Sequence, residues 1–126
     1  MSHLRIDPHI SSIILDTHLE GKIKLRVKFV LDTGSSFVVI PWWIATGLGL
    51  EINQKSLVST MTASTVEHVP FTIIPKVTVL DKTVLNVPCI IKDLPAESGV
   101  DGLLGLSFLK HFKLTIDFKK GILSLE

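Results

Sequence analysis

One aspartate in this sequence stands where an apolar, strand-like run enters a short polar turn. The segment Phe29–Ile40 reads FVLDTGSSFVVI, which places Asp32 between two apolar runs. Gly34 has no Cβ, so the backbone there can turn tightly and another chain can approach closely. Three small hydroxyl residues complete the turn: Thr33, Ser35 and Ser36. Hydroxyl groups can hydrogen-bond a carboxylate or the backbone, and a carboxylate in such surroundings is suited to general acid–base chemistry.

An ordinary turn would use the same residue types. Asp and Gly are common in turns between strands, so the Asp32-Thr33-Gly34 tripeptide alone does not identify a catalytic site. The sequence also contains Asp16-Thr17, which lacks the glycine and the apolar strand that should follow it. We expect no catalytic role for Asp16.

A second motif, Leu103-Leu104-Gly105, lies much later in the chain. Together the two motifs resemble the aspartic proteases of the retropepsin-like clan, and the resemblance spans Lys22–Leu125. In that family an Asp-Thr-Gly turn ends one strand, a hydrophobic-hydrophobic-Gly element passes beneath it, and a short helix follows. Ser107–Phe112 stands where this helix belongs. The resemblance implies a mainly β, closed acid-protease barrel with one short C-terminal helix.

The resemblance also assigns roles to the turn residues. Asp32 would be the catalytic carboxylate, and the Thr33 hydroxyl would bond the active-site loop of a partner chain. Gly34 would contact the substrate backbone, and Ser35 would bond the outer oxygen of Asp32. The hairpin Ser56–Ile74 would be a flap that closes over a bound peptide. Its tip would contribute Met61, Thr62, Ala63 and Ser64.

The sequence departs from the retroviral members at the flap and before the helix. The tip region Met61–Thr65 has no glycine, and the chain has no tyrosine to serve as a pepsin-like flap residue. Gly105-Leu106-Ser107 stands where retroviral enzymes carry Gly-Arg followed by Asp or Asn. These differences bear on flap motion and separate this chain from close retroviral relatives.

The single Asp-Thr-Gly motif has a consequence for assembly. Aspartic-protease chemistry needs two carboxylates at one water, one acting as a base and the other as an acid. The chain has 126 residues, which is the length of one domain, and it has no second Asp-Thr-Gly. A two-fold axis beside Asp32 would bring this residue against its own copy. We therefore expect one domain over residues 1–126, a homodimer, and no cofactor.

The hydrophobic pattern predicts many short strands that close on themselves. Lys22–Phe29 alternates polar and apolar residues without a break, as a half-buried strand does. Lys92–Gly102 contains Pro95 and Gly99 and is expected to be a loop. Other strands are expected at Ser11–Leu19, Phe37–Ile40, Ser56–Met61, Val66–Ile74, Lys76–Leu80, Thr83–Ile91, Lys113–Asp117 and Ile122–Leu125, and helical turns at Trp42–Leu48 and Leu103–Phe112.

Composition and charge narrow the choice of partners. The hydrophobic fraction is 46%, which fits a packed core or an apolar subunit interface, and the net charge is +1. The basic face of Lys22–Phe29 is read as a solvated strand face, because no aromatic residues interleave with its charges. No apolar run approaches the length of a membrane span, and Met1–Ile10 has no signal-peptide core. We expect neither a nucleic-acid nor a membrane partner, and a cytoplasmic location.

Several other residues are candidates for structural or binding roles. Cys89, the single cysteine, has apolar neighbours and is expected to be an inert core residue. Trp42 and Trp43 would point in different directions on a helix, so we expect one in the core and the other at a pocket or interface. Asp101 is either an orienting residue for the second motif or a solvated loop acid. The five histidines share no ligand spacing, and we expect no metal site.

The sequence thus predicts an aspartic endopeptidase that cleaves extended, mainly apolar segments of peptides or unfolded proteins. The alternative is a retropepsin-like dimer with weak or no proteolysis that serves as a peptide-binding or assembly module. The intact Asp-Thr-Gly favours the enzyme, whereas the glycine-free flap tip favours the alternative.

Overall fold

The computed structural model describes residues 2–61 and 65–126 and is built mainly of strands. The strands are β1 Ser2–Arg5, β2 Ile14–Glu20, β3 Lys24–Leu31, β4 Val38–Ile40, β5 Asn53–Met61, β6 Val66–Val79, β7 Lys82–Ile91, β8 Gly102–Leu104, β9 Leu114–Asp117 and β10 Ile122–Leu125. The helices are α1 Trp42–Gly47, the 3-10 turn η1 Ala96–Ser98, and α2 Leu106–Leu109.

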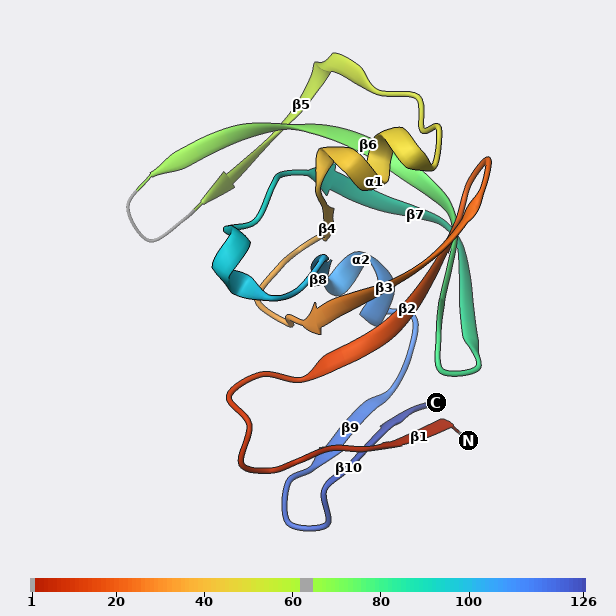
Figure 1. The fold of residues 1–126 in the computed structure, drawn as a ribbon, viewed down its shortest axis with the longest axis vertical. Helices are drawn as coiled ribbons and strands as arrows, with labels where there is room; N and C mark the ends of the chain where they lie inside the picture. The colour runs from red at the N-terminus through yellow and green to blue at the C-terminus, as the bar shows by residue number, and fades with distance from the viewer. Residues whose placement is uncertain (1, 62–64) are drawn as a thin grey trace.

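Six strands form a closed barrel. Their order is β2-β3-β8-β4-β7-β6, and β6 returns to β2 with Thr17 opposite Val79 and Glu20 opposite Lys76. β5 pairs with β6 outside this ring and extends the sheet to seven strands. In Figure 1 the β5–β6 hairpin projects beyond the body of the barrel. The mainly β, closed barrel predicted from the sequence is therefore confirmed.

One face of each strand fills the barrel interior. In β2, Leu15, Thr17 and Leu19 are buried and alternate with exposed residues. β3 repeats this period of two with Val27 and Phe29. The basic residues on the other face, Lys22, Lys24, Arg26 and Lys28, are exposed, as expected of a solvated strand face.

A smaller sheet brings the two ends of the described chain together. Its order is β1-β10-β9, with Ser2 opposite Leu125 and Arg5 opposite Ile122. Figure 1 shows this sheet below the barrel, with the ends marked N and C close to each other. β9 and β10 lie where they were predicted. β1 was not predicted, because its short sequence SHLR carries no strand pattern of its own and becomes a strand by pairing with β10.

β6 is one continuous strand of 14 residues instead of the two separate strands predicted. Pro75, which has no N–H to donate, lies opposite Asn86, between the pairs Ile74–Val87 and Lys76–Leu85. Asn86 has a φ of 56°, a left-handed conformation, and the pairing keeps the same register on both sides of it. The proline is tolerated because Pro75 and Asn86 form no pair of their own in the ladder.

The helical predictions hold only in part. The segment predicted as one helix, Leu103–Phe112, begins as strand β8, and α2 has only four residues. The start of this segment is a strand because it pairs with β3 on one side and β4 on the other. Within the described residues, no helix has the length and apolarity that crossing a bilayer requires.

The prediction that one of the two tryptophans lies in the core is wrong. Trp42 is 38% exposed and Trp43 is 56% exposed. Both stand at the start of α1, whose buried positions are occupied by Ile44 and Ala45. A six-residue helix has a single inward face, and the two tryptophans lie outside it.

Candidate active site

The predicted catalytic turn leaves the barrel at the end of β3. The Asp32 N–H donates to the carbonyl oxygen of Leu104 at 3.1 Å, and the Ser35 N–H donates to the carbonyl oxygen of Asp32 at 3.2 Å. The Gly34 N–H donates to Asp32 Oδ1 at 2.9 Å. Among the described residues, Asp32 Oδ2 has no protein partner. One carboxylate oxygen is thus held in place while the other is available to a water or a substrate.

The second motif lies directly beside this turn. β8 pairs in parallel with β3, with Leu31 opposite Leu104, and in antiparallel with β4, with Val39 opposite Leu103. The Leu106 N–H then donates to the carbonyl oxygen of Ser35 at 2.8 Å. The structure therefore brings Leu103, Leu104 and Gly105 together with the Asp32 turn, as the resemblance implied.

Asp101 ties the start of β8 to β3. The Lys28 N–H donates to Asp101 Oδ2 at 2.8 Å, and the Asp101 N–H donates to the carbonyl oxygen of Lys28 at the same distance. Of the two interpretations of Asp101, the orienting residue fits these bonds. The carboxylate extends the β3–β8 pairing by one step and fixes where the second motif begins.

Ser107 is a supporting residue that sequence reasoning missed. Its side chain is buried, its Oγ accepts a hydrogen bond from the Val38 N–H at 2.8 Å, and it donates to the carbonyl oxygen of Pro88 at 2.7 Å. These bonds join α2 to β4 and β7, directly beneath the strand that leaves the Asp32 turn. The one sequence signal for Ser107 is its position two residues after Gly105 of the second motif.

Ser35 has a different partner from the one expected. Its Oγ donates to the carbonyl oxygen of Phe37 at 2.7 Å, where the resemblance implied a bond to Asp32. The hydroxyl therefore closes the turn between Asp32 and β4. Thr33 and Gly34 are exposed at the tip of the turn, and Asp32 itself is partly exposed.

A cleft with a volume of about 470 Å3 opens over Asp32. Its apolar lining consists of Phe37, Val39, Ile90, Leu94 and Leu103. Its polar lining includes Asp32, Gly34, Ser35, Ser36, Ser59, Thr60 and Lys92. The cleft therefore places one carboxylate at an apolar surface of a size suited to peptide side chains.

The hairpin that was predicted to act as a flap is present as β5–β6. Its strands pair in antiparallel, from Leu57 opposite Pro70 to Met61 opposite Val66, and Ser59 and Thr60 of β5 line the cleft. The predicted tip residues Thr62, Ala63 and Ser64 lie outside the described residues.

An ion pair connects the flap to the barrel. Lys92 Nζ lies 2.7 Å from Glu67 Oε2, and the two side chains are 33% and 39% exposed. Glu67 is on β6, whereas Lys92 follows β7 and lines the cleft. The β6–β7 ladder ends at Phe71 opposite Ile90, so this pair bridges the two strands where they part.

Asp16, the other Asp-Thr residue, lies outside the cleft on β2. Its Oδ2 is 2.7 Å from Arg26 Nη2 on β3. The hydrogen bond from Arg26 lowers the pKa of Asp16 below its usual value. The structure therefore gives Asp16 a place in a surface ion pair and none in the cleft.

Comparisons with known proteins agree with this geometry. The family model described as aspartyl protease matches residues 16–108. A search of curated proteins finds no significant match. The crystal structure of a retropepsin-like aspartic protease from Rickettsia conorii is similar, with a TM-score of 0.69 at 20% identity over 98% of each chain. The retroviral protease-like domain of Ddi1 from Leishmania major has a TM-score of 0.52 at 15% identity, over 93% of this chain and 90% of that one. The fold is thus retropepsin-like, and this chain belongs to the aspartyl protease family.

Proposed function

We propose that this protein is an aspartic endopeptidase that acts as a homodimer. The observation that carries the proposal is the position of Asp32 in the lining of a cleft that is partly apolar. One carboxylate oxygen is held by the Gly34 N–H, and a β-hairpin lies beside the cleft. Membership of the aspartyl protease family supports the same chemistry.

The reaction needs two carboxylates that share one proton. The ionised Asp32 of one chain takes a proton from a water whose oxygen attacks the scissile carbonyl carbon. The protonated carboxyl of the partner's Asp32 gives its proton to the carbonyl oxygen, and a tetrahedral diol forms. When the C–N bond breaks, the leaving nitrogen receives a proton from the pair, and two peptides with new termini are released.

The exposed surface around the turn supports a dimer. Thr33 and Gly34 are exposed at its tip, where the hydroxyl of Thr33 is available to the same loop of a partner. Leu106, beside the turn, is 39% exposed and offers an apolar contact. A two-fold axis at this point would complete a site for which each chain supplies one aspartate.

The lining of the cleft favours extended substrates with apolar side chains. Five of its lining residues are large and apolar, and the flap strand β5 presents Ser59 and Thr60 to the same space. A peptide in an extended conformation places alternate side chains on opposite faces, so some would enter the apolar cleft while its backbone passes Asp32.

Cleavage of an unfolded protein such as casein across pH 3 to 7 tests the proposal. The variants are Asp32→Asn and, as a matched control, Asp16→Asn, which makes the same substitution at a surface aspartate. Cleavage by wild type and Asp16→Asn, together with loss of cleavage in Asp32→Asn, is the expected result. Equal cleavage by all three proteins would contradict the assignment of Asp32. If all three proteins bind the substrate and none cleaves it, the endopeptidase proposal is contradicted and the peptide-binding module is favoured.

A further inference from the structure

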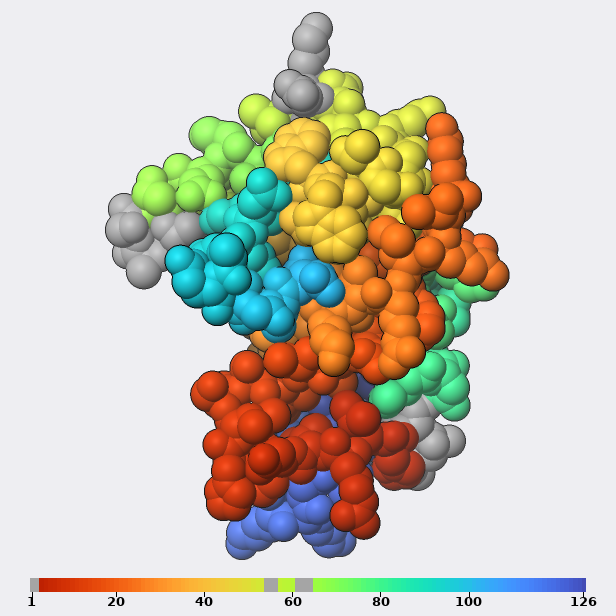
Figure 2. Space-filling model, viewed as in Figure 1, coloured from red at the N-terminus to blue at the C-terminus, as the bar shows by residue number. Residues whose placement is uncertain are grey.

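A second hollow adjoins the catalytic cleft and is not explained by the proposed reaction. It has a volume of about 680 Å3 and lies between the start of α1 and the loop 92–101. Figure 2 shows these two segments side by side on one face of the molecule, α1 in yellow and the loop in cyan. Leu94 lines both this hollow and the cleft over Asp32, so the two hollows meet at this residue. We call the second hollow the tryptophan groove.

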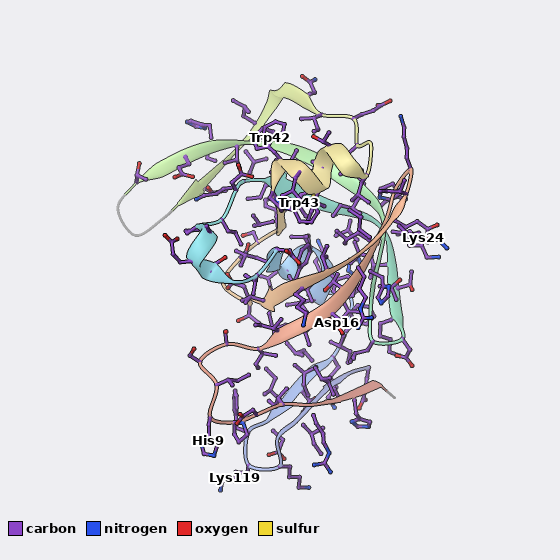
Figure 3. The ribbon with its side chains drawn as sticks, viewed as in Figure 1. His9, Asp16, Lys24, Trp42, Trp43 and Lys119 are labelled. Carbon is purple, nitrogen blue, oxygen red and sulfur yellow. The ribbon has the colours of Figure 1, made fainter. Side chains whose placement is uncertain are left out.

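The groove is named for its two tryptophans. Trp42 and Trp43 both line it, and Figure 3 shows them on α1. Pro41 and Pro95 line it as well. The start of α1 is fixed to the loop because the Trp42 N–H donates to Asp93 Oδ1 at 3.0 Å. The groove is therefore a positioned surface of aromatic and proline rings, of the kind that binds peptide side chains.

The charge of the groove is negative. Asp93 and Asp101 line it, and none of the described residues that line it is basic. Each carboxylate uses one oxygen to hold a backbone N–H, and among the described residues the other oxygen of each has no protein partner. The whole chain has a net charge of +1, so this negative charge is local to the groove.

Two tryptophans and two aspartates in the lining of one hollow suit a cation. Lysine and arginine side chains are attracted to the faces of tryptophan rings, and they pair with carboxylates. An anionic side chain would be repelled by both aspartates, and a purely apolar one would displace water from their free oxygens without offering a donor in return. The lining therefore discriminates in favour of a basic side chain.

We propose that the tryptophan groove extends the substrate-binding surface and takes a Lys or Arg side chain of the substrate, a few residues from the scissile bond. This inference rests on the proposed function, because the occupant is the peptide that also fills the cleft. Because the cleft and the groove share Leu94, one extended chain that passes this residue would reach both. Such a chain advances by about 3.3 Å per residue, so a short extension beyond the cleft is sufficient. The preferred substrates then have an apolar segment at the scissile bond and a basic residue outside it.

Intrinsic fluorescence gives a direct readout of this groove. The chain has two tryptophans and no tyrosine, so its fluorescence near 350 nm, roughly the emission of exposed indole, comes from Trp42 and Trp43. We would titrate the Asp32→Asn protein with three peptides that share one apolar sequence. The first has Arg at both ends, the second Gln and the third Glu. The anisotropy of labelled peptide gives the same affinities independently.

The Arg peptide is expected to change the fluorescence and to bind about fivefold more tightly than the Gln peptide, with the Glu peptide weakest. Adding the substitutions Asp93→Asn and Asp101→Asn to this protein should abolish the difference in affinity between the Arg and Gln peptides. Asparagine keeps an acceptor oxygen for the backbone N–H groups that these side chains hold, so these variants should fold. Asp81→Asn, at an exposed aspartate in the β6–β7 turn, should preserve the difference.

Equal affinity for the three peptides, or an Arg preference that survives the double substitution, would overturn the groove proposal. Lack of binding by all three peptides would overturn it as well. Failure of the proposed function is seen separately, as lack of cleavage by the wild type. If the wild type cleaves all three peptides equally, the protease proposal stands and the groove proposal is overturned.

Discussion

The carbonyl oxygen of Phe37 occupies the space that a side chain on Gly105 would need. A Cβ on Gly105 would meet this oxygen and would lie 2.7 Å from the carbonyl oxygen of Ser35. Both obstacles are backbone atoms of the turn between Asp32 and β4, so they cannot move without displacing the turn. The glycine of the second motif is thus required by the close approach of two backbones.

Gly105→Ala should therefore destabilise the protein by about 2 kcal/mol or more, as overpacking against rigid neighbours does. Urea unfolding followed by circular dichroism measures this loss. Gly47→Ala is the control, because a Cβ there would lie an ordinary 3.8 Å from Leu25 Cδ1. A helical Gly→Ala change should be neutral or stabilising by up to about 1 kcal/mol. Equal stability of the two variants would contradict the close-approach explanation.

Ser107→Ala should cost about 2 kcal/mol of unfolding free energy. The change leaves the buried Val38 N–H and the Pro88 carbonyl oxygen without their shared partner. Equilibrium denaturation again provides the measurement, with the exposed Ser12→Ala as the matched control. If both serine variants unfold at the wild-type midpoint, Ser107 does not hold β4 to β7.

Cys89 should be inert to thiol reagents in the folded protein. It is fully buried, and burial raises the pKa of its thiol from 9.0 to about 12. Ellman's reagent at pH 8 should react with the thiol in urea but not under native conditions. Fast labelling of the native protein would show that β7 opens readily around this residue.

The same shift in pKa makes stability fall at alkaline pH. Between about pH 9 and 12 the unfolded chain loses the thiol proton while the folded chain keeps it. This contribution to stability is therefore complete below pH 9 and is lost as the pH rises, by about 1.4 kcal/mol per pH unit. The free energies of unfolding of wild type and Cys89→Ala, each measured at pH 8 and pH 10.5, isolate the contribution of the thiol. A stability difference between the two proteins that does not change with pH would contradict the shift.

The ion pair between Lys92 and Glu67 should restrain the flap. Lys92→Met and Glu67→Gln should each increase amide hydrogen exchange in residues 57–61 and 65–69, because each removes the bridge between β6 and the end of β7. Partly exposed pairs contribute about 0.2–1 kcal/mol, so an increase of up to about fivefold is expected. The charge-swapped double variant, Lys92→Glu with Glu67→Lys, should restore protection. Equal exchange in the wild type and both single variants would show that the flap does not depend on this pair.

The turn and the second motif could be predicted because each is a short run of sequence with a strong local pattern. Asp32-Thr33-Gly34 and Leu103-Leu104-Gly105 can be recognised without knowledge of what lies beside them. The strands with a clear period of two were also predicted, whereas β1 was not, since it depends on its partner β10.

The supporting contacts could not be predicted, because each joins residues far apart in the sequence. The Asp101 carboxylate holds a backbone N–H 73 residues away, and Ser107 joins two strands through one hydroxyl. Neither leaves a periodic pattern in the chain. The exposure of Trp42 and Trp43 was missed because it depends on the short length of α1 and on how Ile44 and Ala45 fill its inward face.

The most direct test of the central claim is to mix wild-type chains with Asp32→Asn chains and measure cleavage at constant total concentration. If each active site uses one Asp32 from each of two chains, mixed dimers are inactive and activity follows the square of the wild-type fraction. An equal mixture, allowed to exchange subunits fully, should then retain about one quarter of wild-type activity. Retention of about one half, in proportion to the wild-type chains present, would show that each chain works alone and would contradict the shared site.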